Sequence, residues 1–244
     1  MEAVALTSNA AATAAGATNY MDLSGVSAAT DITVTGAADT DIAAVGSAFD
    51  TLDAATATGD ITANLTGAGG ISAGDIVSVT TGAGDDSVTV DIADLNAKAA
   101  INLGDGTDTL DMNGVGGTSR PVLKGVEELD VSGQTGALLM NMTDSTSIST
   151  ISMADAGDAS TGFKEYAGTV QLTNASGDLT VDISGDTANN SGVTTDSTGA
   201  ISVNLTANVD ATKAANNDVE TDITADDASA LTITTGALTG FNVT

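Results

Sequence analysis

Residues 81–90 read Thr-Gly-Ala-Gly-Asp-Asp-Ser-Val-Thr-Val, a glycine-rich turn that carries aspartate and runs directly into alternating apolar and polar residues. Residues 103–111, Leu-Gly-Asp-Gly-Thr-Asp-Thr-Leu-Asp, repeat this arrangement. Glycine allows a positive φ in such a turn, and the apolar residue two places after the aspartate begins a strand whose side chain points inward. Both copies fit the pattern Gly-x-Gly-x-Asp-x-apolar, filled by Gly82, Gly84, Asp86 and Val88 and then by Gly104, Gly106, Asp108 and Leu110.

This pattern resembles the calcium-binding nonapeptide repeat of the RTX family of secreted bacterial proteins. The two copies depart from the family at one place, because Thr81 and Leu103 replace the first of its paired glycines. Together with residues 126–133, Val-Glu-Glu-Leu-Asp-Val-Ser-Gly, the pattern is similar to the RTX-type surface-layer (S-layer) proteins of Gram-negative bacteria. The resemblance covers residues 81–133 and is only compositional elsewhere. It implies a parallel β-roll and assembly into a calcium-dependent crystalline coat outside the cell.

The two turns also predict a metal site. The spacing of Gly82 and Gly104 corresponds to about one rung of a roll, and stacked rungs lie about 4.8 Å apart. Carboxylate and carbonyl oxygens are the ligands that Ca²⁺ prefers, about six to eight of them. The resemblance implies that one ion bridges consecutive turns. We therefore expect Ca²⁺ between the carboxylates of Asp86 and Asp108 and the carbonyls of residues 82–84 and 104–106. The candidate metal residues are Asp86, Asp108, Gly82, Gly84, Gly104 and Gly106.

An alternative interpretation is that glycine and aspartate occupy these turns for backbone reasons alone. Residues 35–42, Thr-Gly-Ala-Ala-Asp-Thr-Asp-Ile, are a degenerate copy with the acids one place off, and they form a weaker candidate site.

The spacing of the apolar strand openings predicts the fold. Two series of such openings alternate along the chain, and each has a period of about 20 residues, in the range of stacked repeats. Two alternating series of this kind indicate a solenoid with one strand on each face of every rung. The expected fold is therefore all-β, a parallel β-solenoid; an antiparallel β-sandwich is the alternative. The first series is Val88, Leu110, Leu129, Ile151 and Val170, and the second is Ile101, Val122, Met142, Phe163 and Val181.

We expect two parts in the chain. Residues 1–58 are interpreted as an irregular Ala/Thr-rich lead-in with one or two strands, of which residues 31–36 are the clearest. Residues 59–244 are interpreted as the solenoid, with a polar loop around 206–227. Residues 91–100, Asp-Ile-Ala-Asp-Leu-Asn-Ala-Lys-Ala-Ala, contain good helix formers and predict one helical turn within a rung.

The composition excludes several classes of function. The chain has 33 acidic and five basic residues, a net charge of -28, which argues against nucleic acid and anionic membranes as partners. No apolar run reaches the roughly 18 residues that membrane insertion requires. Histidine and cysteine are absent, which removes catalytic triads and disulfides. We therefore expect no enzyme. The acidity suggests cations as partners, although it is also explained by solubility or a saline habitat.

The sequence thus predicts a structural protein of the bacterial cell surface, extracellular and self-assembling, with Ca²⁺ as its cofactor. Its expected partner is itself, as a homo-oligomer in a lattice or filament; cell-surface polysaccharide, bound through another region, is a further candidate. Two alternatives remain open: the subunit of an extracellular surface filament, and a calcium-binding RTX module of an adhesin, toxin or exoprotease.

Overall fold

The computed structural model describes residues 2–9, 17–67, 71–114, 117–119, 121–131, 138–141, 147–154, 169–173, 178–184, 191–195, 200–206, 219–225, 230–235 and 241–242. The chain divides into two compact units. Unit 1 consists of Met1–Asp111 and Ser119–Glu128, and unit 2 of Met112–Thr118 and Leu129–Thr244. The described residues form strands, turns and loops without a helix, so this part of the chain offers no helix long and apolar enough to span a membrane.

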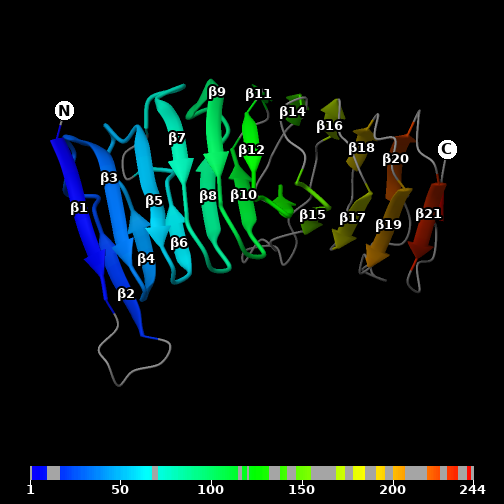
Figure 1. The fold of residues 1–244 in the computed structure, drawn as a ribbon. Helices are drawn as coiled ribbons and strands as arrows, with labels where there is room; N and C mark the ends of the chain where they lie inside the picture. The colour runs from blue at the N-terminus through cyan, green and yellow to red at the C-terminus, as the bar shows by residue number, and fades with distance from the viewer. Residues whose placement is uncertain are drawn as a thin grey trace, which may run out of the picture. The chain divides into compact units, whose positions relative to one another are not determined.

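Unit 1 is a parallel β-solenoid of about five turns, with rungs about 22 residues apart. Each rung is one strand of sheet A followed by one strand of sheet B, and Figure 1 shows the two rows of strands. This confirms the predicted fold, and the antiparallel sandwich is wrong because the strands pair in parallel. Sheet A contains β1 (Glu2–Ser8), β3 (Ala29–Gly36), β5 (Thr51–Ala57), β7 (Ile76–Thr80), β9 (Leu95–Asn102) and β12 (Val122–Lys124); sheet B contains β2 (Thr18–Asp22), β4 (Asp39–Ala44), β6 (Ile61–Asn64), β8 (Ser87–Asp91) and β10 (Thr109–Asn113).

The core lies between the two sheets and is built from alternate residues of each strand. In β8, Val88 and Val90 are fully buried while Ser87, Thr89 and Asp91 are partly exposed. In sheet A the parallel register likewise places buried residues beside each other: Val79 of β7 pairs with Ile101 of β9. Burying one such side chain stabilises the fold by about 1.5–3 kcal/mol, so the alternation of apolar and polar residues fixes which face of each strand is inside.

The segment that ends at Ala57 differs from the predicted irregular lead-in. It contains five strands, β1 to β5, which belong to the same two sheets as the later rungs. Ile32, Val34, Ile42 and Leu52 are buried there, with 2% exposure at most. Alanine and threonine are common in these strands at both buried and exposed positions, so the composition hides the alternation of inward and outward residues.

The helical turn expected in residues 91–100 is also wrong. A short turn covers residues 92–94, and β9 begins at Leu95. The pairing of β7 with β9 shows where the helix-forming residues go. Ile76 pairs with Leu95 and Ser78 with Ala100, so β9 has more residues than β7 between the two pairs. The extra residues form a bulge in the ladder, in which Asn96, Ala97 and Lys98 are exposed.

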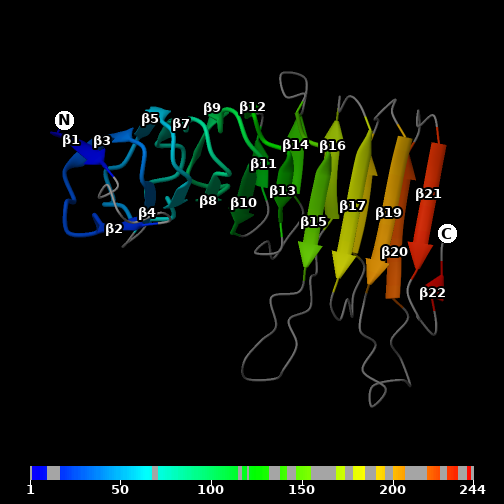
Figure 2. The ribbon, with the colours of Figure 1, turned by 60° about the horizontal axis from the view of Figure 1, so that its bottom comes forward.

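Unit 2 is likewise built from two parallel sheets, and Figure 2 shows β15, β17, β19 and β21 side by side. Its repeat is longer in places than that of unit 1, since Ile151 pairs with Val181 and Val203 with Ile233. One row of strands in this unit is β13 (Glu128–Asp130), β15 (Thr150–Ala154), β17 (Leu179–Ser184), β19 (Ala200–Thr206) and β21 (Ala230–Thr235), which belong to sheet B; the other row is β11 (Gly117–Ser119), β14 (Leu138–Asn141), β16 (Thr169–Thr173), β18 (Ser191–Thr195), β20 (Val219–Ala225) and β22 (Phe241–Asn242).

This longer repeat corrects the predicted series beyond Ile151. Val170 lies in β16, which pairs with β14 and β18, whereas Val181 lies in the same sheet as Ile151. The prediction places Val170 in the series of Ile151, and Val181 in the other series, and the structure shows the reverse assignment. Strand β20 falls inside the expected polar loop at 206–227. Met142 and Phe163 lie outside the described residues.

Candidate functional site

The two Gly-Asp turns lie in neighbouring rungs of unit 1 and stack on each other. Residues 81–86 connect β7 to β8, and residues 103–108 connect β9 to β10. Ala83 and Asp105 form a parallel bridge between the turns. The Asp105 N–H donates to the Gly82 carbonyl (3.0 Å), and the Gly84 N–H donates to the Asp105 carbonyl (3.1 Å). The structure thus places all six predicted metal residues in two adjacent turns.

Glycine is required in these turns because the rungs approach each other closely. A Cβ on Gly104 would overlap the carbonyl oxygen of Gly82, and a Cβ on Gly106 would overlap that of Gly84. The φ angles of Gly104 and Gly106 are +94° and +152°, which residues with a side chain disfavour. The same stacking continues at Gly125, which lies over the Gly104 carbonyl. Backbone packing therefore accounts for the glycines whether or not a metal is present.

Thr81, which departs from the RTX pattern, also joins the rungs. Its buried hydroxyl donates to the Leu103 carbonyl of the next rung at 2.6 Å. A glycine at position 81 would lack this bond between rungs.

The aspartates of the pattern belong to a column of carboxylates that we call the inner column: Asp86, Asp108 and Glu127. Each accepts a hydrogen bond from a backbone N–H of the preceding rung. Asp86 Oδ1 accepts from Ile61 (2.7 Å), Asp108 Oδ1 from Asp86 (2.8 Å) and Glu127 Oε2 from Asp108 (3.0 Å). The inner column therefore caps N–H groups at the entry to the strands of sheet B.

Each aspartate of the pattern retains one oxygen without a partner. Oδ2 of Asp86 and Oδ2 of Asp108 are buried and accept no hydrogen bond from the part of the chain that the structure describes. The two residues are only 2% and 0% exposed. A buried carboxylate oxygen that lacks a donor is costly unless a proton or a cation neutralises it, so these two atoms are the ones available to a ligand.

The electrostatics follow from this burial. Burial raises the pKa of Asp108 to about 6; the hydrogen bond from Asp86 opposes the rise, and the charges of Asp86, Glu127 and Asp85 add to it. Burial likewise raises the pKa of Asp86; the nearby polar groups of Thr81, Ile61 and Gly82 oppose the rise, and the charge of Asp60 adds to it. A site that resists carrying two bare negative charges favours a bound positive charge.

The sequence pattern does not predict a second set of carboxylates, which we call the outer column: Asp39, Asp60 and Asp85. Asp39 Oδ1 accepts from the Asp60 N–H (3.1 Å), Asp60 Oδ1 from Asp85 (2.9 Å) and Asp85 Oδ1 from Thr107 (2.9 Å). In the inner column each carboxylate accepts from the preceding rung, whereas in the outer column each carboxylate accepts from the following rung. One feature of the sequence could have indicated Asp60 as a member of this column, because Asp60 stands between Gly59 and the buried Ile61, at the entry to a strand. Asp39 lies in the degenerate copy at residues 35–42.

The structure limits what a metal would find here. Within the described ranges no group of three or more acidic side chains is placed to hold a metal ion. Asp86 and Asp108 supply two carboxylates, and further oxygens would come from backbone carbonyls or water. The Gly82 and Asp105 carbonyls already accept hydrogen bonds, from the Asp105 and Gly84 N–H groups, so each has only one lone pair left for a metal ion.

Fold and site together define a parallel β-solenoid whose rungs are joined by carboxylates at the turns. No protein-family model, no curated protein and no solved structure matches the chain.

Proposed function

We propose that the chain is a calcium-stabilised structural protein of the bacterial cell surface that assembles with copies of itself into a surface layer. One observation carries the calcium part of this proposal: Asp86 Oδ2 and Asp108 Oδ2, two buried oxygens in adjacent stacked turns, have no hydrogen-bond partner among the described residues. The surface-layer part rests on the resemblance of residues 81–133 to RTX-type S-layer proteins.

The chemistry of the available ligands favours Ca²⁺. The chain has no histidine or cysteine, so its ligands are oxygens, which suit hard cations. Ca²⁺ accepts irregular sets of carboxylates, carbonyls and water more readily than Mg²⁺ does. Asp86 and Asp108 would hold the ion together with carbonyls of the two turns. The bound charge would offset the repulsion of the two carboxylates.

The charge of the whole chain supports the same function. A net charge of -28 opposes compaction, and a cation that binds only the folded state stabilises that state. A surface protein in a calcium-containing medium would therefore hold its solenoid more firmly outside the cell than in a calcium-poor compartment.

We expect the melting temperature of the wild-type chain to rise with Ca²⁺ and to fall with EGTA. The Asp86→Asn/Asp108→Asn variant loses this response because its amides keep the Oδ1 acceptors but carry no charge. At 100 times the dissociation constant, calcium would stabilise the fold by about 2.7 kcal/mol. Calorimetric titration with CaCl₂ and thermal unfolding followed by circular dichroism measure the two effects.

The matched control is Asp41→Asn/Asp53→Asn, which removes the same charge from the outward faces of β4 and β5 and should keep the full calcium response. If neither the wild type nor the control shows heat or a change in melting temperature, the aspartates only cap backbone N–H groups and the calcium proposal fails.

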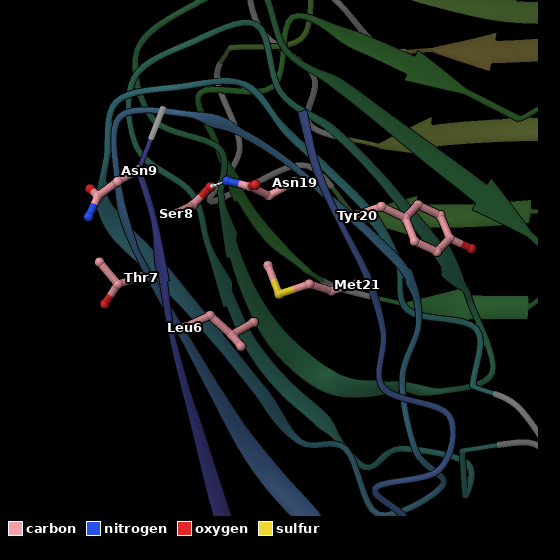
Figure 3. Close-up of a pocket in the computed structure, with 7 residues that line it drawn as sticks. All are labelled: Leu6, Thr7, Ser8, Asn9, Asn19, Tyr20 and Met21. Atoms are coloured by element: carbon pink, nitrogen blue, oxygen red, sulfur yellow. Dashed lines mark hydrogen bonds between the residues drawn. The ribbon is translucent and has the colours of Figure 1, made fainter. Parts of the chain in front are cut away.

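A second candidate function, the subunit of a surface filament, is favoured by the rung formed by β1 and β2. Among the described strands, β1 pairs with β3 alone and β2 with β4 alone, so each leaves one edge open to another strand. A pocket of about 360 Å³ lies on this rung (Figure 3), where Tyr20 is 68% exposed and its ring points away from Leu6. Leu6, Thr7, Ser8, Asn9, Asn19, Tyr20 and Met21 line the pocket.

For the filament we expect a second copy to cover this rung, and Tyr20→Asp to weaken that association. Losing a central aromatic contact costs about 2 kcal/mol or more, roughly 30-fold in affinity. Light scattering and negative-stain electron microscopy measure the particle mass and shape. Val77→Asp adds the same charge at another exposed apolar position, 52% exposed in β7, and should not change assembly. Two-dimensional sheets that tolerate Tyr20→Asp would favour the surface layer, and a monomer at all concentrations would contradict both modes of assembly.

A further inference from the structure

We propose that Asp94 forms a proton-controlled contact between the rung of β7 and β8 and the rung of β9 and β10. The contact lies in the loops that enter sheet A, whereas the stacked Gly-Asp turns enter sheet B. It therefore involves none of the candidate calcium ligands and does not depend on the proposed function.

Backbone hydrogen bonds place Asp94 at the contact between the two rungs. The Ile76 N–H donates to the Asp94 carbonyl (2.9 Å), and the Gly74 N–H donates to the Ala93 carbonyl (3.0 Å). Within its own turn, the Asp94 N–H donates to the Asp91 carbonyl (3.0 Å). The loop before β7 is thus bonded directly to the turn before β9.

The side chain of Asp94 is largely buried in this contact and has no hydrogen-bond donor among the described residues. The residue is only 7% exposed, and no hydrogen bond from a described residue reaches its side chain. The neighbouring Asp91 has a partner, since its Oδ1 accepts from the Ala93 N–H at 2.9 Å. A buried carboxylate that lacks a donor is more stable protonated than charged.

The charged groups facing Asp94 are also acidic. Asp91 lies at the end of β8, in the same turn as Asp94, and Asp75 lies directly before β7. The row continues to Asp50 before β5, whose pKa is raised by burial and then by Asp75 and Asp31. A proton on Asp94 would therefore remove a repulsion that spans two rungs.

The direction of the pH effect follows. Burial, then the charges of Asp91 and Asp75, raise the pKa of Asp94 to about 6, from 3.8 in the unfolded chain. The folded chain binds the Asp94 proton more tightly than the unfolded chain does. The stabilisation of the fold by this proton is therefore complete below the unfolded pKa of 3.8. It is lost as the pH rises toward about 6 and changes little above that.

Asp94→Asn tests the proposal, because its amide can donate to the neighbouring carboxylates at every pH. With EDTA present, we expect the variant to melt several degrees above the wild type near pH 7.5. We expect the difference to shrink toward zero near pH 4, as Asp94 of the wild type becomes protonated. Asp53→Asn, on the exposed face of β5, is the control and should show no such trend. A difference that is independent of pH would overturn the proposal.

A measurement on the wild-type fold keeps the proposal falsifiable if the variant behaves unexpectedly. The carbon-13 shift of the Asp94 carboxyl should titrate near pH 6 in the wild type. In Asp91→Asn it should titrate at lower pH, because one facing charge is gone. A midpoint near that of an unfolded aspartate, about 3.9, would mean that Asp94 carries no proton at mildly acidic pH.

Discussion

Gly104→Ala lowers the free energy of unfolding of unit 1 by about 3 kcal/mol or more, in the range expected when overpacking and backbone strain act together. Two effects combine at this position. The new Cβ would overlap the Gly82 carbonyl oxygen of the rung below, and φ is +94°. The rungs cannot separate at this point without losing the Asp105–Gly82 hydrogen bond and the bridge beside it. Urea unfolding followed by circular dichroism measures the loss, with EDTA present so that metal binding does not contribute.

Two control variants separate the overlap from the strain. Gly74 has φ +84°, but no atom lies within 4 Å of the place that a Cβ would occupy, so Gly74→Ala suffers strain alone, about 1 kcal/mol or somewhat more. Gly25 has neither a positive φ nor a neighbour, so Gly25→Ala should be close to neutral. If Gly104→Ala costs no more than Gly74→Ala, the turns do not stack as closely as the structure places them.

Phe49→Ala should destabilise unit 1 by about 3–5 kcal/mol, the range for removing a buried phenylalanine. Phe49 is fully buried and is the largest side chain in the described core. It follows the turn in which its N–H donates to the Gly46 carbonyl (3.3 Å). The surrounding strands are held in register by parallel pairing, so the cavity left by alanine cannot easily collapse. Chemical denaturation gives the change in unfolding free energy.

The control for Phe49→Ala is Tyr20→Ala, which removes an aromatic ring that is 68% exposed and should change stability by about 0.5 kcal/mol or less. Phe49→Leu should recover part of the loss because it refills much of the cavity. Equal effects of Phe49→Ala and Tyr20→Ala would mean that Phe49 is not packed inside unit 1.

The stacked turns could be predicted from sequence because Gly-x-Gly-x-Asp is a local pattern with a local cause. Its two copies are spaced by one rung, and the structure places them side by side in adjacent rungs. The role of Asp86 and Asp108 as metal ligands stays a prediction. The hydrogen bonds of their Oδ1 atoms could not be predicted, because they depend on which backbone N–H of the preceding rung lies opposite.

Other features could not be predicted, for physical reasons. Glu127 completes the inner column although its neighbourhood lacks the glycine pattern, because a longer side chain reaches the Asp108 N–H at 3.0 Å. The faces of Val170 and Val181 are exchanged in the prediction because loop length is weakly constrained by stability. A loop can therefore lengthen the repeat between Ile151 and Val181 while their strands keep their parallel pairing.

The opposite directions of the inner and outer columns make the rungs modular. In the inner column a carboxylate caps the rung before it, and in the outer column a carboxylate caps the rung after it. A rung that carries one acid of each column thus offers a carboxylate acceptor to the rung before it and another to the rung after it. A duplicated copy of such a rung would therefore find matching backbone N–H groups on both neighbours. Gene duplication or deletion of a segment that encodes one rung would then change the solenoid's length in steps of about 4.8 Å without requiring a new core.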